Sequence, residues 1–210
     1  MSTSDLAVDE ALIAQVTEYV KGYMSNYDPS HDFHHIERVV KLAQHIHSAS
    51  SSSTSREIVT LSALLHDVGD KKYLKPGEDS SRLVHTLLTS LGAADTLAEK
   101  VQAICLGVSY SSEVKNPARV LDLICEHPEL AIVQDADRLD AIGAVGIGRA
   151  FTFGGAKNQT MQQTMDHFAE KLVHLEGMMK TDVGRAMARE RTDRIRAMQE
   201  WWLLETEGVA

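Results

Sequence analysis

The sequence predicts an all-α fold in a single domain spanning residues 1–210. Apolar residues recur at spacings of three and four along most of the chain, as they do on the buried face of a helix. The chain has only four prolines, and residues that favour helices, such as Ala, Leu, Glu and Lys, are common. No short run alternates between apolar and polar residues as a half-buried strand does.

Four apolar faces follow one another in the first half of the chain. They cover 12–23 (Leu12, Val16, Tyr19 and Tyr23), 36–46 (Ile36, Val39 or Val40, Ala43 and Ile46), 61–68 (Leu61, Leu64, Leu65 and Val68) and 83–91 (Leu83, Leu87, Leu88 and Leu91). Each segment is expected to bury this face in a common core. The serine-rich stretch 48–55 is expected to be a surface loop, because small polar residues mark connections.

The second half of the chain carries three further faces. They cover 97–105, 120–124 and a long final helix at about 182–204, with Leu97, Val101, Ile104 and Cys105, then Val120, Leu123 and Ile124, then Met187, Ile195, Met198 and Trp202. The segment 154–159 (GGAKNQ) is expected to be a second surface loop. In all, the periodic segments predict about eight to ten helices.

Charge and composition exclude several classes of protein. The formal net charge of −9 disfavours nucleic-acid binding, which needs clustered Lys and Arg. No apolar run is long enough to cross a membrane, and the N-terminus lacks the pattern of a secretory signal. The two cysteines form no CxxC motif, which favours a reducing compartment. We therefore expect a cytoplasmic protein, and a nuclear location stays open.

A histidine and an aspartate follow an almost wholly apolar helix. His66 and Asp67 come directly after Leu61–Leu65, where a buried charge is costly unless it is paired or binds a metal. An imidazole and a carboxylate suit Mn²⁺, Mg²⁺, Fe²⁺, Co²⁺ or Zn²⁺. On these two residues alone, a helix end that satisfies its own carbonyl groups explains the pair equally well.

Two other segments favour the metal. His35 shares a helical face with Val39 and Ala43, and Asp137 follows the apolar stretch 130–133. Together with His66 and Asp67 they supply two imidazoles and two carboxylates, a set that leaves coordination positions open for water and substrate. His31 and His34 are the alternatives to His35 as the first ligand.

The order H…HD…D, with a wide gap before the last aspartate, resembles the HD-domain superfamily of metal-dependent phosphohydrolases. The strings SHDFHHIERV, LLHDVGD, DADRLDAIGAVGIGRAF and DHFAEKL resemble the small bacterial and fungal members regarded as nucleotide phosphohydrolases, over about 27–172. The resemblance implies a compact helical bundle around one divalent metal. It makes His35 the first ligand, His66 and Asp67 the central pair and Asp137 the last.

Hydrolysis of a phosphate ester or anhydride also needs groups that move protons and neutralise charge. Asp70 is a candidate to take a proton from water, provided that the helix carrying Asp67 continues. Arg38 is a candidate catalytic cation, one turn after His35. The candidate substrate contacts are Lys71, Lys72, Arg138, Asp140, His167 and Lys171. For the cations the alternative is an ordinary surface charge, and Asp140 could instead orient a ligand histidine.

The expected function is hydrolysis of a small phosphate substrate, most simply a nucleoside or deoxynucleoside triphosphate, with release of phosphate or pyrophosphate. A phosphodiesterase or 5′-nucleotidase of the same superfamily and a non-catalytic nucleotide-sensing module are the alternatives. A two-iron oxygenase would need further ligands, and His85 and His127 match no second-metal motif. Relatives often carry a histidine where Val108 stands, which puts substrate preference in question. A homodimer is a further expectation.

Overall fold

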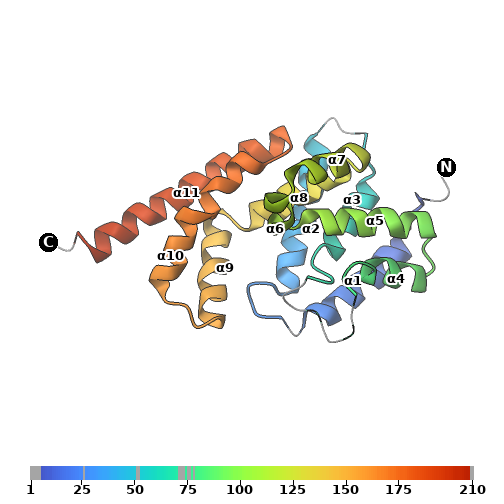
Figure 1. Cartoon of the computed structure of the whole chain (residues 1–210), viewed down its shortest axis with the longest axis horizontal. Helices are drawn as coiled ribbons and strands as arrows, with labels where there is room; N and C mark the ends of the chain where they lie inside the picture. The colour runs from blue at the N-terminus through green and yellow to red at the C-terminus, as the bar shows by residue number, and fades with distance from the viewer. Residues whose placement is uncertain are drawn as a thin grey trace.

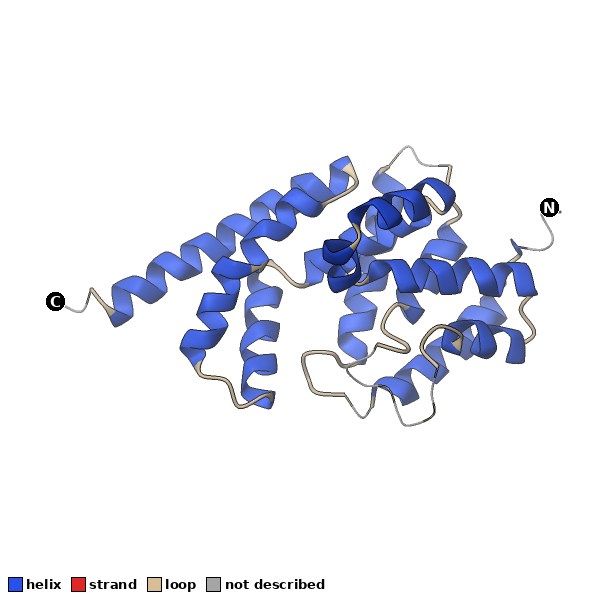
Figure 2. Cartoon of the chain, viewed as in Figure 1, coloured by secondary structure: helices blue, strands red, loops and turns tan. Residues whose placement is uncertain are grey.

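The computed structural model describes residues 6–25, 27–50, 53–70, 74, 77 and 79–208. This part of the chain contains helices and no strand, which confirms the all-α prediction (Figure 2). Its elements are α1 (Glu10–Met24), α2 (Phe33–Ala49), α3 (Arg56–Leu65), α4 (Leu83–Ser90), α5 (Asp95–Val108), α6 (Tyr110–Lys115), α7 (Pro117–Glu126), α8 (Glu129–Asp140), α9 (Gly143–Ala156), α10 (Met161–Glu170), the 3₁₀ helix η2 (Leu172–Met178) and α11 (Asp182–Thr206).

Side-chain caps set where several of these helices begin. The Asp32 carboxylate accepts a hydrogen bond from the backbone N–H of His35 at 3.1 Å, at the start of α2. Ser55 Oγ accepts from the N–H of Ile58 in the same way at the start of α3. Such caps satisfy backbone donors that a helix leaves unpaired. The cap on α2 therefore fixes His35 in the first turn of its helix.

The helices divide into a larger cluster and a smaller one (Figure 1). Helix α2 packs against both α3 and α8, and these three helices lie at the centre of the larger cluster. In the smaller cluster α11 packs against α9 and η2, and it also contacts α8. The buried core includes Ile36, Val39, Leu61, Leu65, Leu130, Val133, Leu139 and Ile142.

The helix count and two boundaries differ from the sequence prediction. The described residues form eleven α-helices and η2, more than the eight to ten expected, because short helices such as α6 have no long apolar face. Helix α3 ends at Leu65, and Gly69 then adopts a left-handed backbone with φ of +85°. Helix α9 continues to Ala156, so the loop predicted at 154–159 begins three residues late; Gly154 is buried where α9 meets Thr164 of α10.

Candidate metal centre

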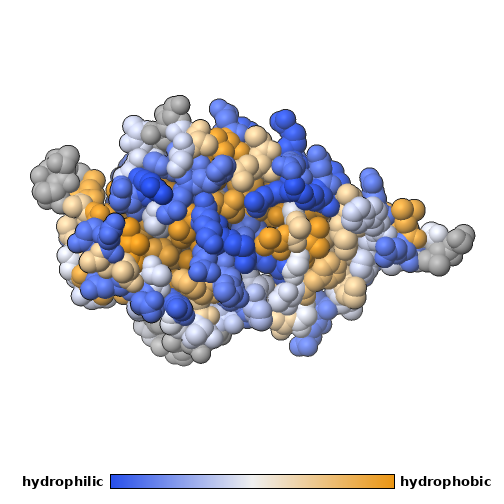
Figure 3. All heavy atoms as spheres, turned by 180° about the vertical axis from the view of Figure 1, so that it is seen from behind, coloured by the Kyte–Doolittle hydropathy of each residue, from blue (hydrophilic) through white to orange (hydrophobic). Residues whose placement is uncertain are grey.

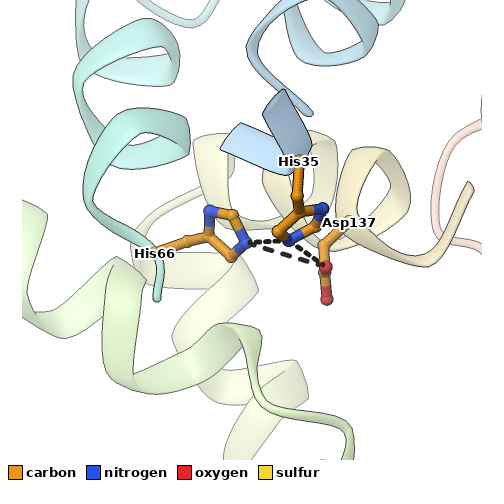
Figure 4. A group of neighbouring side chains, drawn as sticks. All are labelled: His35, His66 and Asp137. Carbon is orange, nitrogen blue, oxygen red and sulfur yellow. Dashed lines mark hydrogen bonds and ion pairs between the residues drawn. The ribbon is translucent and has the colours of Figure 1, made fainter. Parts of the chain in front are cut away.

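Three helices bring His35, His66 and Asp137 together (Figure 4). His35 comes from the first turn of α2, His66 from the C-cap of α3 and Asp137 from α8. The Nε2 atoms of the two histidines lie 3.2 Å apart, and each is 3.7 Å from Asp137 Oδ1. Donor atoms on neighbouring positions of a metal at about 2.1 Å are about 3 Å apart, so these atoms can share one ion.

Asp67 adds a fourth donor to this group. Its Oδ2 lies 3.3 Å from His35 Nε2, and its Oδ1 lies 3.5 Å from His66 Nε2. Asp67 Oδ2 is buried and makes no hydrogen bond to any described residue. A buried carboxylate oxygen without a hydrogen bond is costly unless a cation binds it. The donor set therefore fits a divalent metal.

The outer nitrogen of each ligand histidine is already used. His66 Nδ1 lies 2.8 Å from the carbonyl oxygen of Ala63, and His35 Nδ1 lies 2.8 Å from Asp140 Oδ2. Both partners are acceptors, so Nδ1 carries the proton and donates in each case. Each Nε2 is then left to present its lone pair towards the centre, as a ligand must.

The electrostatics of the centre shift the pKa of His66, Asp67 and Asp137. Burial alone would lower the pKa of His66, but the carboxylates of Asp67 and Asp137 raise it to about 9. Burial would raise the pKa of both aspartates, and the neighbouring histidines hold each below its ordinary value. The centre thus favours positive charge, which a divalent ion supplies more strongly than a proton.

Asp140 holds the first turn of α2, which carries His35, in place. It is almost wholly buried, with 2% of its side chain exposed. Besides His35, it accepts from Arg38 Nε at 2.8 Å and pairs with Arg149 at 3.1 Å. Burial would raise its pKa, but the hydrogen bonds from His35 and Arg38 hold it well below the usual range. This geometry matches the alternative that Asp140 orients a ligand histidine, and it leaves little surface for a substrate.

Arg138 does not meet its expected role as a substrate contact. Its side chain is 3% exposed, pairs with Glu113 and donates to the carbonyl oxygen of Met178 at 3.2 Å. One residue is a rotation of about 100° around a helix, so the neighbour of Asp137 in sequence points elsewhere. Arg138 joins α8 to α6 and η2 instead.

Three of the predicted site residues follow His66 and Asp67 closely in the sequence: Asp70, Lys71 and Lys72. Because α3 ends at Leu65, Asp70 does not share a helical face with Asp67; its backbone N–H instead donates to the Asp67 carbonyl oxygen at 3.2 Å, in a turn. The Asp70 side chain is half-buried. Lys71 and Lys72 lie outside the described residues, so their roles remain predictions.

A cavity of about 300 Å³ lies near His35, and none of the four donors lines it. Its walls include His31, Arg149, His167 and Lys171, and so two of the predicted substrate contacts meet there. The ring of His31 is 6.0 Å from the ring of His35, and Arg149 reaches Asp140, so the cavity adjoins the ligand set. Burial, and then the charge of Lys171, lower the pKa of His167, which keeps this imidazole neutral near pH 7.

Arg149 is the functional residue that the sequence reasoning missed. Besides its pair with Asp140, its Nε donates to the carbonyl oxygen of Ser30 at 2.7 Å, which ties α9 to the start of α2. One signal was present: Arg149 is the only charged residue between Gly143 and Ala156. A single charge in a helix of small and apolar residues has to find a buried partner.

The other histidines take separate positions. His34 is 77% exposed and pairs with Glu37, so it does not face the donor group. The His31 ring packs edge-on against that of His35 and lines the cavity. His85 belongs to another cluster, with Asp95 at 2.8 Å on α5. His127 lies beside Glu126, at 3.7 Å.

Comparisons with known proteins agree with this arrangement. The model of the HD domain family matches residues 32–142, a range that holds all four donors. The protein YpgQ of Bacillus subtilis is 36% identical over 181 residues, which cover 84% of this chain and 85% of YpgQ. No helix in the described part of the chain is long and apolar enough to cross a membrane.

Solved structures are similar over almost the whole chain. The crystal structure of Bacillus subtilis YpgQ in complex with ADP superposes with a TM-score of 0.76 at 32% identity and covers 95% of this chain and 97% of that one. An HD-superfamily hydrolase from Bacillus thuringiensis superposes with a TM-score of 0.70 at 28% identity and covers 93% and 97%.

Proposed function

This chain belongs to the HD domain family, and from that premise we propose that it is a metal-dependent hydrolase of nucleotides. The most favoured substrates are nucleoside or deoxynucleoside triphosphates, cleaved to release phosphate or pyrophosphate. The observation that carries the proposal is the convergence of His35, His66, Asp67 and Asp137, with a cavity lined by cationic side chains near His35. The ADP bound by the YpgQ structure supports a nucleotide as the ligand class.

In this proposal the four donors hold one divalent ion. That ion, when bound, lowers the pKa of water and neutralises phosphate oxygens. Two nitrogen and two oxygen donors suit Mn²⁺, and also Mg²⁺, Fe²⁺, Co²⁺ and Zn²⁺. Asp140 keeps the His35 ring oriented through its hydrogen bond to Nδ1, and Arg38 and Arg149 neutralise the Asp140 carboxylate in turn.

The cavity would position the phosphate chain. Arg149 and Lys171 line it, and both cations can offset the negative charge of a phosphate chain. Lys171 Nζ also lies 4.5 Å from the centre of the Tyr110 ring, which holds the end of this flexible side chain in place. His167 stays neutral and can donate one hydrogen bond to a phosphate or leaving-group oxygen.

Asp70 remains the candidate base. Burial raises the pKa of Tyr27 most, followed by Tyr23 and then by the charges of Asp67 and Asp70. Both carboxylates are therefore near the Tyr27 hydroxyl group. A half-buried carboxylate in the turn after Asp67 is suited to accept a proton from water near the donor group. A phosphodiesterase or 5′-nucleotidase would use the same groups, and a sensing module would use them without turnover.

The test is product release from a panel of nucleoside mono-, di- and triphosphates and cyclic nucleotide diesters. The protein is stripped with a chelator, and each divalent metal is then added back separately. We expect phosphate or pyrophosphate release from triphosphates with at least one metal, and none from the stripped protein. Release from monophosphates or cyclic diesters alone would favour the other hydrolases, and tight nucleotide binding without any release would favour the sensing module.

A further inference from the structure

The long helix α11 carries opposite charges at its two ends. Residues 182–196 hold five arginines and three acidic residues, whereas residues 197–208 hold three glutamates and no lysine or arginine. The first part is therefore net positive by two charges and the second net negative by three. In a chain of net charge −9 this local excess of arginine stands out. The helix is thus complementary to a second copy of itself laid in the opposite direction.

One side of α11 presents this contrast as a continuous stripe. The stripe consists of Arg185, Arg189, Arg196, Glu200, Leu203 and Glu207. Their spacings of four, seven, four, three and four place them on one face of a helix. The side chains of Arg189 and Arg196 are 73% and 53% exposed, and Leu203 is 52% exposed.

A hollow borders the arginine end of this stripe. Its volume is about 420 Å³, and its walls come from α11 and η2, including Arg185, Arg189 and Arg196. Glu176 of η2 approaches Arg189 and Arg196 only to 3.8 Å, and Arg196 also reaches Asp193 at 3.0 Å. These are exposed pairs, which solvent and salt weaken, so a further carboxylate can compete for the arginines.

The other end of α11 is apolar as well as acidic. The C-terminal turns extend beyond the rest of the smaller cluster (Figure 1), and apolar side chains gather near this end in the rear view (Figure 3). Trp201, Leu203 and Leu204 are 61%, 52% and 65% exposed. By contrast, Trp202 packs on Phe151 and donates to Gln162 at 3.2 Å. Three large exposed apolar residues in four positions are typical of an interaction surface.

We propose that two copies of this chain pair through α11 in antiparallel orientation, about a two-fold axis near residue 198. This register brings Arg189 opposite Glu207 of the partner subunit and Arg196 opposite Glu200 of the partner subunit, each twice by symmetry. Leu203 of each copy then lies against the hollow of the other. Leu203 supplies an apolar contact at each hollow, and the ion pairs set the direction and register.

A nucleic acid is a poorer occupant of the same surface. The arginines alternate with Asp182, Glu190 and Asp193, and the tip carries three glutamates, which would repel a phosphate backbone. A second copy satisfies both ends of the stripe at once. The inference does not depend on the proposed hydrolysis, because none of the stripe residues belongs to the donor group or the cavity.

The test uses Arg189 and Glu207, which lie about 27 Å apart along one helix and cannot contact each other within a chain. Sedimentation velocity over a range of concentrations gives the dimer Kd for wild type, R189E, E207R and the double variant. We expect each single variant to weaken the dimer by about tenfold or more, because like charges then face each other. The double variant should return to within about threefold of wild type, since the pair is restored with its signs exchanged.

The matched control is R194E, which makes the same charge change at an exposed arginine on the other side of α11. It should leave the Kd unchanged, and circular dichroism should show equal helix content in all variants. A wild-type chain that stays monomeric at the highest soluble concentration overturns the proposal. So does a dimer that R189E and E207R leave intact, or one that they weaken without rescue in the double variant.

Discussion

Asp140 Oδ2 lies 2.8 Å from Nδ1 of His35, a residue 105 positions earlier in the chain. This hydrogen bond links the last turn of α8 to the first turn of α2 and turns His35 Nε2 towards His66. Asp140 is almost wholly buried, and we propose that it is a positioning residue that would act on a bound metal through His35.

Asp140→Asn should weaken metal binding more than it affects folding. The amide can still occupy the space and accept one hydrogen bond, but it lacks the charge that favours the Nδ1-protonated ring and pairs with Arg38. We expect an affinity for the divalent ion lower by about 10- to 100-fold, as is usual when such a partner is changed. Calorimetric titration measures it, and activity should recover as the metal concentration rises. Unchanged affinity would contradict the positioning role.

Arg138→Met should lower stability and leave substrate binding alone. The change leaves Glu113 paired with Lys180 alone, at 2.7 Å, in a largely buried position. Breaking a buried pair from one side costs about 3 kcal/mol of the free energy of unfolding. Denaturant unfolding measures this loss, with Lys115→Met on the exposed surface of α6 as the control. A raised KM with unchanged stability would restore Arg138 as a substrate contact.

The pKa of His167 should respond in opposite directions to its two charged neighbours. After burial, Lys171 lowers this pKa and Glu170 raises it. NMR titration should therefore give a value below the ordinary 6.5 in wild type, a higher one in Lys171→Gln and a lower one in Glu170→Gln. Because folding lowers this pKa, His167 binds a proton more readily in the unfolded chain. Its contribution to the free energy of unfolding is therefore fully present above the unfolded-state pKa and is lost as the pH falls towards the folded-state pKa. A wild-type pKa at or above 6.5 would contradict the predicted lowering.

Lys171→Gln should raise the KM for a triphosphate while metal affinity stays the same. Lys171 lines the cavity but is not one of the four donors. Loss of one charge-assisted contact to a phosphate costs about tenfold in binding. Steady-state kinetics at saturating metal test this, with Lys115→Gln as the control. Equal KM values for the two variants would remove Lys171 from the substrate site.

The sequence predicted the fold class, and the four residues that it proposed as metal ligands lie close together in the structure. His66 and Asp67 follow an apolar helix directly, and the motif strings align His35 and Asp137 with a known family. Roles that depend on where a helix ends, or on which face of it a side chain lies, were less predictable. Asp70 lost its expected position because α3 ends at Leu65, and Arg138 points away from its neighbour Asp137.

Contacts between distant helices were beyond the reach of sequence patterns. Arg149 meets Asp140 of α8 and Ser30 in the segment before α2, and no spacing in the sequence encodes that approach. The hollow beside α11 likewise depends on where η2 packs. Val108, which the family resemblance singled out as a possible substrate-contact position, is buried in the core of the protein.

The central claim is that His35, His66, Asp67 and Asp137 hold one divalent metal, and a neighbouring pair of histidines tests it most directly. His34→Ala and His35→Ala remove the same side chain at adjacent positions, one 77% exposed and the other 1% exposed. Metal-free protein is titrated with Mn²⁺ by calorimetry, and bound metal is counted after gel filtration. The account predicts one ion per chain in wild type and in His34→Ala, and binding weaker by at least about 100-fold in His35→Ala with helix content retained. Full binding by His35→Ala, or its loss in His34→Ala alone, would contradict the assigned centre.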